Sequence, residues 1–275
     1  MRLEFIKMHG LGNDFVVLDG RNKKLPHLSS QNIVNISNRN NGIGCDQVII
    51  LERSKNTDAE FCMRIFNADG SEVEACGNAA RSVAVLHGKP ANIETIGGII
   101  SIEPSQRTAT VHMGFPNFEW DAIPLSYAMD TASLPVGWEN LENPCAVNIG
   151  NPHLVFFTDD CFSIDLSTIG PKIENDPIFP EKINVNVATI VSRNLIRLRV
   201  WERGVGLTKA CGTGACATAV AAMRRDLVDR KVTVELPGGA LKVRWPNNES
   251  VQMSGPACES FRGSFDLSYF GENFR

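Results

Sequence analysis

The sequence contains no apolar run long enough to cross a lipid bilayer. Residues 1–7 mix charged and apolar side chains, so we expect no secretory signal peptide. Neither sign of charge dominates, because 27 lysines and arginines stand against 31 aspartates and glutamates, giving a net charge of −4. The sequence also lacks the basic stripe of nucleic-acid-binding proteins and the polybasic segment of a membrane anchor. We therefore expect neither a nucleic acid nor a membrane as a partner.

The Cys-x-x-Cys spacing of redox and zinc sites is missing too, although the chain has 8 cysteines. The absence of this spacing disfavours a thiol-based redox or metal-binding protein. Elemental analysis for zinc would test that alternative. A chain of 275 residues, 43% of them hydrophobic, can bury a core of its own. We therefore expect reduced thiols in the cytoplasm. Most of these thiols should be small buried hydrophobic groups. We expect structural roles for Cys45, Cys62, Cys145, Cys161, Cys216 and Cys258.

Short stretches of the first half of the chain recur in the second half. They come in the same order, and their separation is always close to half the chain length. A single echo would be weak evidence, but three in order are hard to attribute to chance. The sequence therefore predicts two copies of one structural unit. Residues 12–17 match 150–155, and residues 94–98 match 235–239. Between them, residues 64–67 match 199–202, and residues 75–80 match 210–215.

Each copy has the patterns of several strands and one central helix. The helices are expected over Gly77–Leu86, with Gly88 as a stop, and over Gly212–Leu227, whose first turns are apolar on every face and hence buried. The predicted class is α+β, with two similar halves related by pseudo-twofold symmetry. In each half a curved, mostly antiparallel sheet wraps around the helix. The expected strands are 15–18, 48–51, 61–66, 99–102, 154–157, 196–201, 231–236, 240–245 and 261–270.

The boundary between the halves is expected in the proline-containing stretch 114–135, which has little periodicity. We place the N-terminal half at residues 1–118 and the C-terminal half at 119–261. Residues 262–275 are expected to return to the first half and complete its sheet.

Both copies place a cysteine directly before a glycine at the start of a helix. The first N–H groups of a helix lack internal partners and carry partial positive charge. They can lower the pKa of a thiol and bind a carboxylate or a developing enolate. Gly77 and Gly212 would let the backbone approach such a ligand closely. One such cysteine is more often structural, but the matched pair of Cys76 and Cys211 indicates a catalytic role.

Two thiols, one from each half, suit inversion of configuration at a carbon atom. Inversion requires a base on one face of the carbon and an acid on the other. Two related halves supply one group each, and the roles exchange when the reaction runs backward. We therefore predict that Cys76 and Cys211 move a proton on and off carbon.

At this point the sequence resembles the diaminopimelate epimerase family over nearly the whole chain. The motifs that carry the resemblance are long and occur in order, so they are far more specific than a short pattern. They are MHGLGNDF at 8–15, GIGCDQ at 42–47, FNADGSE at 66–72, GNPH at 150–153, INV at 183–185, ERG at 202–204 and ACGTGAC at 210–216.

The resemblance implies an epimerase without cofactor or metal that interconverts LL- and meso-diaminopimelate for lysine and cell-wall synthesis. It implies a homodimer and a small amino-acid substrate. Cys76 and Cys211 would be the acid–base pair, tuned by His153 and Glu202. The implied substrate-binding set, including donors to the carboxylate at the reacting centre, is Asn13, Gln47, Asn67, Gly77, Asn78, Asn151, Asn184, Glu202, Arg203, Gly212 and Thr213.

These residue types suit a substrate with two amino-acid ends. Such a zwitterion needs many neutral hydrogen-bonding groups and one bidentate cation, here Arg203. Taken singly, each asparagine more often serves a turn or a helix cap, and His153 would be a structural histidine. The nearest alternative is a proline racemase-like enzyme of the same two-half fold that acts on a smaller amino acid. Asn67, Asn184 and Arg203 favour the longer substrate.

Overall fold

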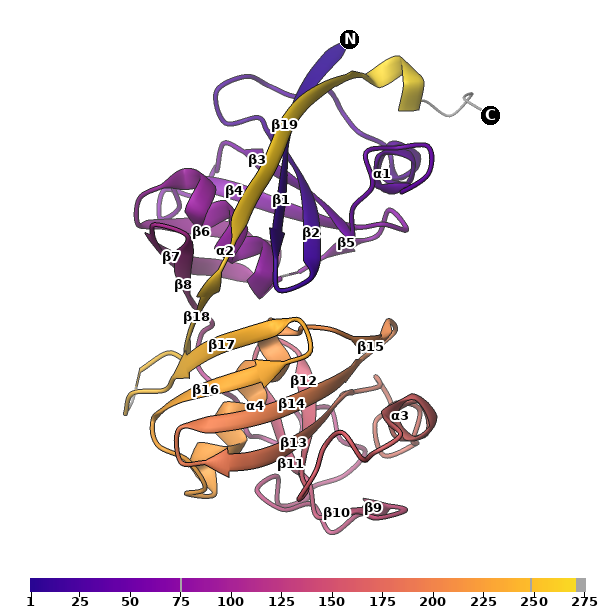
Figure 1. Ribbon diagram of the computed structural model, residues 1–275, viewed down its shortest axis with the longest axis vertical. Coiled ribbons are helices and arrows are strands. Elements are labelled where there is room, and N and C mark those ends of the chain that lie inside the picture. The colour runs from indigo at the N-terminus through magenta and orange to yellow at the C-terminus, as the bar shows by residue number, and fades with distance from the viewer. Residues whose placement is uncertain (75, 248, 271–275) are drawn as a thin grey trace. The chain divides into compact units, whose positions relative to one another are not determined.

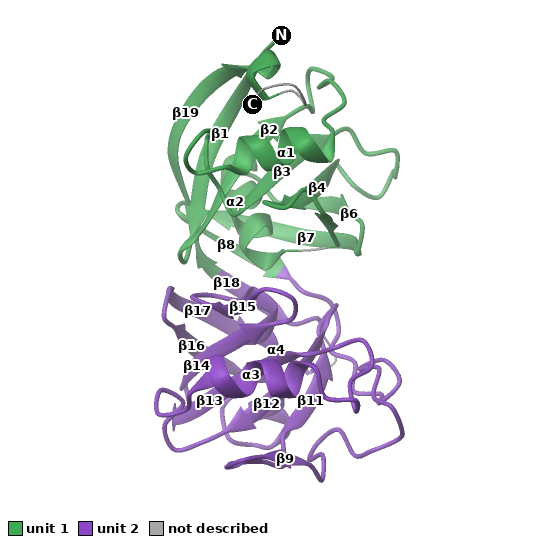
Figure 2. Ribbon diagram, turned by 90° about the vertical axis from the view of Figure 1, so that its right-hand side faces the viewer, with its two compact units in different colours: residues 1–111, 255–275 green, residues 112–254 purple. Residues whose placement is uncertain are grey.

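The structure is a computed structural model that describes residues 1–74, 76–247 and 249–270 (Figure 1). The chain forms two compact units (Figure 2). Unit 1 comprises Met1–Val111 together with the chain from Gly255, and unit 2 comprises His112–Ser254. Strands dominate both units and helices are few, so the predicted α+β class is confirmed. Within the described residues, no helix is both long and apolar enough to cross a membrane.

Unit 1 is a mixed, mostly antiparallel sheet with two α-helices. The neighbours β19–β1–β2 are antiparallel, β2–β3 is parallel, β3–β4 is antiparallel, β4–β6 is parallel, and β6–β7–β8 are antiparallel. The elements are β1 (Arg2–Gly10), β2 (Asn13–Asp19), α1 (Ser30–Ser37), β3 (Gln47–Glu52), β4 (Phe61–Asn67), β5 (Glu72–Val73), α2 (Gly77–His87), β6 (Ala91–Thr95), β7 (Gly98–Ser105), β8 (Thr108–His112), β19 (Cys258–Asp266) and the 3-10 helix η1 (Leu267–Phe270).

Unit 2 repeats the order from β1 to β8 of unit 1, without counterparts of β19 and η1, and adds one short hairpin, β9–β10. Its pairs β12–β13 and β14–β16 are parallel, and the remaining pairs are antiparallel. The elements are β9 (Gly137–Trp138), β10 (Leu141–Glu142), β11 (Cys145–Asn148), β12 (Pro152–Phe157), α3 (Leu166–Glu174), β13 (Asn184–Ser192), β14 (Leu195–Glu202), β15 (Gly206–Thr208), α4 (Gly212–Arg224), β16 (Lys231–Leu236), β17 (Gly239–Arg244) and β18 (Gln252–Pro256).

The two units are similar down to the register of their strands. Ile65 pairs with Val73 between β4 and β5, and Val200 pairs with Thr208 between β14 and β15. In each unit the central helix is the crossover between two parallel strands, β4 and β6 or β14 and β16. The prediction of two similar halves is confirmed.

The central helices are held by burial more than by helix propensity. In α4 every residue from Gly214 to Met223 is buried, and the helix contacts β11, β12, β13, β14, β16 and β17. The helix ends at Arg224, before the predicted Leu227, because Asp226 adopts a left-handed backbone with φ 53°. Helix α2 ends at His87, one residue after the predicted Leu86, and Gly88, the predicted stop, takes φ 79° as its C-cap.

Three other predicted elements need correction. Strand β17 stops at Arg244, one residue before the expected end. The expected strand 261–270 divides, because β19 ends at Asp266 and residues 267–270 form a 3-10 turn. The proline-containing stretch 114–135 forms no named helix or strand, yet it buries Ile123, Leu125 and Leu134 in the core of unit 2. Residues 271–275, which the sequence assigned to the first half, lie outside the described residues.

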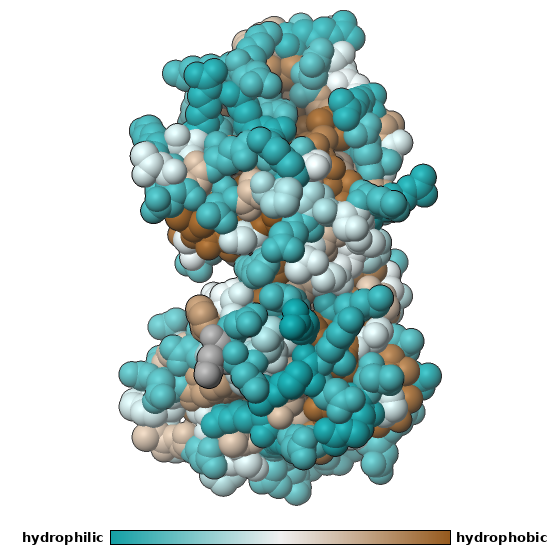
Figure 3. Space-filling model, turned by 90° about the vertical axis from the view of Figure 1, so that its left-hand side faces the viewer, coloured by the Kyte–Doolittle hydropathy of each residue, from teal (hydrophilic) through white to brown (hydrophobic). Residues whose placement is uncertain are grey.

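The strands of unit 2 alternate between core and solvent. In β16 the side chains of Val232, Val234 and Leu236 are buried, whereas Lys231 and Glu235 are exposed. Hydrophilic side chains accordingly cover most of the face drawn in Figure 3, and hydrophobic ones form small separate patches.

Helix α3 packs so tightly against β14 that only glycine fits at position 170. A β-carbon there would lie 2.6 Å from the Trp201 ring, and the Trp201 indole is anchored by a 2.7 Å hydrogen bond from Nε1 to Glu174. We expect Gly170→Ala to lower the free energy of unfolding by about 1–3 kcal/mol, because overpacking outweighs a gain of about 1 kcal/mol in helix propensity. Urea unfolding would measure the change. In a Trp201→Ala background the same substitution should become neutral or stabilising, and an unchanged loss there would contradict the explanation.

Candidate active site

Each cysteine motif forms the entrance to a central helix. Cys76 is the N-cap of α2 and Cys211 is the N-cap of α4, as the sequence predicts. Both have an extended backbone, with φ −145° and ψ 112° at Cys76 and φ −131° and ψ 116° at Cys211. Each thiol therefore sits where the first N–H groups of a helix point outward.

The Cys211 thiol is buried and bound to its own helix. Its sulfur accepts a hydrogen bond from the Gly214 N–H at 3.3 Å and lies 3.5 Å from the Thr213 hydroxyl oxygen. Burial and the neighbouring charge of Glu202 raise the pKa of the Cys211 thiol well above its ordinary value, and the helix hydrogen bonds offset only part of this. The geometry therefore favours the protonated thiol at Cys211.

Cys76 differs from Cys211 in its surroundings. It is half-buried, whereas Cys211 is 4% exposed, and its side chain does not cap helix α2. The equivalent of Cys216 in α2 is Arg81, which is fully buried. Its guanidinium reaches back to the first turn, donating to the Asn78 side-chain oxygen at 2.7 Å and to the Gly77 carbonyl at 3.4 Å. The two helix N-termini therefore have similar backbone conformations but different charged neighbours.

Glu202 ends strand β14 beside Cys211. Its carboxylate accepts a hydrogen bond from the Thr208 hydroxyl at 2.5 Å and another from the Cys211 thiol. Burial raises the pKa of Glu202, and these two hydrogen bonds partly offset the rise. Thr208 lies on β15, so the short β14–β15 ladder fixes the carboxylate.

His153 lies in the core of unit 2, with no exposed surface. Its Nε2 is 2.9 Å from Oδ1 of Asn151, and its Nδ1 is 3.1 Å from Nδ2 of Asn186. Burial lowers the pKa of His153 to about 3, so the imidazole is neutral at physiological pH. Asn151 and His153 were predicted site residues, whereas sequence reasoning missed Asn186.

Asn184 links the start of β12 to the turn that follows β14. Its side chain donates to the Pro152 carbonyl at 2.8 Å and accepts from the Arg203 N–H at 2.9 Å. The Arg203 guanidinium remains exposed and donates to the Glu181 carbonyl at 3.1 Å. Asn184 therefore links Pro152, which follows Asn151, to Arg203, which follows Glu202.

Glu174 is a second residue that the sequence did not reveal. It is 5% exposed, and its carboxylate accepts from the Gly204 N–H at 2.9 Å as well as from Trp201. Gly204 takes φ 74°, which suits a glycine. Helix α3 thus supports the loop that carries Glu202 and Arg203.

In unit 1, Gln47 and Asn67 form a cross-strand pair. The Gln47 amide donates to the Asn67 side-chain oxygen at 3.0 Å, and Asn67 in turn donates to the Ser71 hydroxyl at 3.2 Å. The Gln47 side-chain oxygen is buried and has no hydrogen-bond partner among the described residues. It is an acceptor available to a donor group of a ligand.

Asn13 and Asn78 form the other polar group of unit 1. Asn13 donates to Asp46 at 2.7 Å and accepts from the Asn78 amide at 3.4 Å. Asn78 is 3% exposed, and its orientation is set because its oxygen receives the Arg81 hydrogen bond. The structure therefore brings together Asn13, Asn78 and the helix turn that follows Cys76.

Asp14, the residue after Asn13, is held by a cluster of charged side chains. Arg39 donates to Asp14 at 2.7 Å and to Asp46 at 2.7 Å, and Lys7 forms an ion pair with Asp14. These cations hold the pKa of Asp14 far below its usual range despite burial. The cluster therefore fixes the start of β2, where the Asn13 amide has Asp46 as its charged partner.

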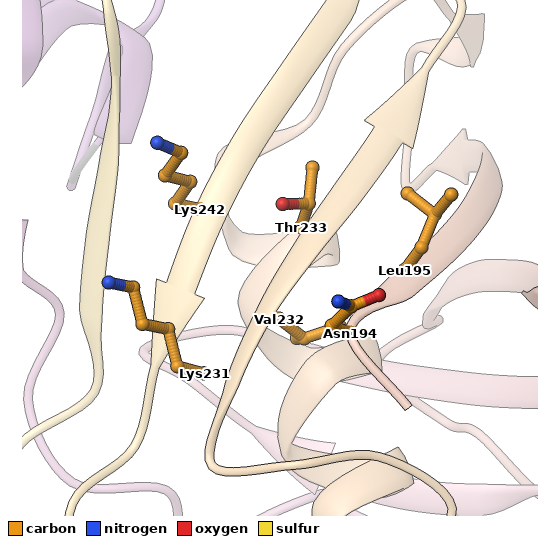
Figure 4. Close-up of a pocket in the computed structure, with 6 residues that line it drawn as sticks. All are labelled: Asn194, Leu195, Lys231, Val232, Thr233 and Lys242. Atoms are coloured by element: carbon orange, nitrogen blue, oxygen red, sulfur yellow. The ribbon is translucent and has the colours of Figure 1, made fainter. Parts of the chain in front are cut away.

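A separate pocket of about 430 Å³ lies on the sheet of unit 2 (Figure 4). Its exposed side chains, such as Lys231 and Lys242, point away from the core in which α4 packs. The pocket therefore opens on the face opposite to the helix that carries Cys211, and it contains none of the predicted site residues. Its lining is Asn194, Leu195, Lys231, Val232, Thr233 and Lys242. Across the chain as described, histidine, cysteine and acidic side chains form no group of three or more that could hold a metal ion.

The fold of this chain matches that of several solved structures. The structure is similar to that of a probable proline racemase from Agrobacterium radiobacter, with a TM-score of 0.69, 13% sequence identity, and coverage of 98% of this chain and 94% of the other. A hydroxyproline epimerase from Agrobacterium vitis is similar too, with a TM-score of 0.67, 12% identity, and coverage of 96% and 92%. At such low identity these matches establish the two-unit fold.

Sequence comparison is more specific. A diaminopimelate epimerase from Erythrobacter litoralis is 61% identical over 266 residues, covering 97% of this chain and 98% of the relative. One from Rhizorhabdus wittichii is 54% identical over 275 residues and 100% of both chains. The family profile named diaminopimelate epimerase matches residues 5–119 and 145–258. The chain belongs to the diaminopimelate epimerase family.

Proposed function

We propose that this protein interconverts LL- and meso-2,6-diaminopimelate without a cofactor, in the formation of lysine and peptidoglycan precursors. The observation that carries the proposal is the matched pair of cysteines at the N-caps of α2 and α4. We propose the cytoplasm as the site of action. We further propose that it acts as a homodimer, as the family resemblance implies.

The proposed reaction is proton transfer by two thiols. One cysteine, as thiolate, takes the α-hydrogen as a proton and becomes a thiol. The electron pair left on the α-carbon is delocalised into the carboxylate, and the helix N–H groups at Gly77, Asn78, Gly212 and Thr213 would stabilise the added charge. The other cysteine gives its proton to the opposite face and becomes a thiolate. The product has the inverted configuration, and the two thiols have exchanged roles.

The two thiols are proposed to differ before substrate binds. Burial and the Glu202 carboxylate disfavour ionisation of Cys211 by raising its pKa, so this residue is proposed to start as the acid. Cys76, half-buried at its helix entrance, is proposed to start as the base. His153 contributes as a neutral group, because its low pKa keeps a positive charge away from this part of the core.

The polar side chains suit a substrate with ammonium and carboxylate groups at both ends. The exposed guanidinium of Arg203 can form a bidentate pair with a carboxylate. The unpaired oxygen of Gln47 can accept a hydrogen bond from an ammonium group. The remaining proposed contacts come from neutral amides and backbone groups: Asn13, Asn67, Gly77, Asn78, Asn151, Asn184, Gly212 and Thr213, together with the Glu202 carboxylate.

The direct test of this function is incubation of the purified enzyme with LL-diaminopimelate, followed by separation of the stereoisomers by chiral chromatography. We expect formation of the meso isomer until both isomers coexist at equilibrium, without added metal or cofactor. L-Proline serves as the comparison substrate and should not racemise. Racemisation of proline with no reaction of diaminopimelate would contradict the proposal.

Replacing Glu202 by glutamine is expected to change the ionisation of Cys211. Removal of the neighbouring negative charge should lower the pKa of the Cys211 thiol. The alkylation rate of this residue by iodoacetamide, followed against pH by peptide mass spectrometry, should therefore rise at a lower pH in Glu202→Gln than in the wild type. Glu181→Gln, which removes an exposed carboxylate, is the control. An identical pH profile in Glu202→Gln and in the wild type would remove Glu202 from the role of tuning this thiol.

A further inference from the structure

The buried amide of Asn186 has only one orientation that satisfies its neighbours. Its Nδ2 lies 3.0 Å from the Leu154 carbonyl oxygen and 3.1 Å from Nδ1 of His153. A carbonyl oxygen can only accept, so the NH2 end of Asn186 must face Leu154. The second hydrogen of the same NH2 group is then directed to His153. Asn186 is fully buried in β13, so solvent cannot replace either hydrogen bond.

The orientation of Asn186 determines which nitrogen of His153 carries the proton. Because Nδ1 accepts from Asn186, the neutral ring has its hydrogen on Nε2. The Nε2–H then donates to the Asn151 side-chain oxygen at 2.9 Å. This oxygen is thereby committed to His153, and the NH2 group of Asn151 is directed away from the ring.

The orientation of Asn186 leaves its own side-chain oxygen without a hydrogen-bond partner among the described residues. This oxygen is buried and faces the first turn of α4, where a β-carbon added to Gly214 would lie only 2.7 Å away. An unsatisfied buried oxygen is destabilising, and an apolar side chain of similar size would avoid that penalty. The donor groups of Asn186 are the feature that an apolar residue could not provide.

We propose that Asn186 is a positioning residue that fixes the His153 tautomer, so that Asn151 presents its NH2 group to an acceptor oxygen of the substrate. The hydrogen bonds connect three side chains of unit 2: Asn186 on β13, His153 on β12, and Asn151 in the loop before β12. Asn151 is half-buried, whereas the other two are fully buried. The inference rests on the proposed function in one respect, namely that Asn151 contacts the substrate.

The first test is the tautomer of His153 in the unmodified enzyme. Long-range proton–nitrogen NMR of protein labelled with ¹⁵N-histidine distinguishes the Nδ1–H, Nε2–H and doubly protonated rings, and His153→Gln identifies the signal among the 5 histidines. We expect the Nε2–H form at pH 7 and still at pH 5, where an exposed histidine is mostly protonated. A ring protonated at Nδ1 under these conditions would overturn the proposal. This measurement does not depend on the reaction that the enzyme catalyses.

The second test is a double-mutant cycle with leucine at positions 186 and 151. Asn186→Leu should yield a mixture of His153 tautomers and raise KM for diaminopimelate about tenfold, the loss of one oriented hydrogen bond to a charged group. In an Asn151→Leu background it should cause no further rise, because the amide that it positions is already gone. Additive effects on KM would overturn the proposal. If Asn186→Leu does not fold, the His153 tautomer measured in the wild type decides whether the proposal holds. Absence of any epimerase activity in the wild type would instead refute the proposed function and leave the tautomer result standing.

Discussion

Cys76→Ala and Cys211→Ala are each expected to lower kcat for epimerisation by about 10²–10⁴-fold, the usual contribution of a positioned acid or base. Each variant retains one thiol, but inversion requires transfer on both faces of the carbon. A single remaining thiol could remove the proton and return it only to the face from which it came. The measurement is the initial rate of conversion of LL- to meso-diaminopimelate by each variant at saturating substrate.

The matched control is Cys216→Ala in the same helix as Cys211. Cys216 is fully buried and lies beyond the first turn of α4, so its loss should affect packing and leave the rate close to that of the wild type. Thermal unfolding of all three variants would show whether a loss of activity reflects a loss of structure. Near wild-type turnover by Cys76→Ala or by Cys211→Ala, in a folded protein, would exclude that cysteine from the reaction.

The internal repeat allowed the central features to be predicted from the sequence. Cys76 and Cys211 were placed at helix entrances because the motifs around them match, and the structure has both at N-caps. The all-apolar start of α4 identified a buried helix, since a surface helix has a polar face. Repetition supplied the evidence that a lone motif lacks.

Two helices were not predicted because their signals are weak or contradictory. Helix α1 begins with a capping box formed by Ser29 and Asn32, in which asparagine replaces the usual glutamate or glutamine. Helix α3 contains Gly170 and Pro171, residues that disfavour a helix interior. Here the contact between Gly170 and Trp201 overrides helix propensity, and only the fold brings these two residues together.

The supporting residues of the site could not be predicted for a different reason. Glu174 and Asn186 belong to no motif that links them to the cysteines, and their roles depend on burial and on hydrogen bonds across the fold. A glutamate and an asparagine in stretches without a predicted helix or strand have many ordinary explanations. A buried polar side chain becomes informative once its partners are known.

The similarity of the two units makes their electrostatic differences more informative. Equivalent backbone positions hold Arg81 in α2 and Cys216 in α4, and Asn67 in β4 and Glu202 in β14. The first unit therefore carries a buried cation in its central helix, and the second carries a carboxylate that contacts its thiol. Two identical thiol environments would give two identical pKa values. A reaction that starts with one base and one acid benefits from this difference.

Epimerisation in heavy water is expected to place deuterium at the inverted centre of nearly every meso-diaminopimelate molecule formed first. With two separate thiols, the hydrogen removed from the substrate stays on one sulfur. The product receives its hydrogen from the other sulfur, which exchanges with solvent between turnovers. Mass spectrometry of the early product, combined with proton NMR at the α-carbons, would measure the label.

Two internal controls accompany this measurement. The unreacted LL isomer should remain largely unlabelled at early times, because a proton returned to its original face is the one that was taken. The α-carbon at the far end of the substrate should never exchange, since it is proposed to be held by neutral amides and Arg203, which are poor bases at neutral pH. Early meso product that retains most of its original hydrogen would mean that one base serves both faces. The paired roles proposed for Cys76 and Cys211 would then be wrong, even if diaminopimelate proved to be the substrate.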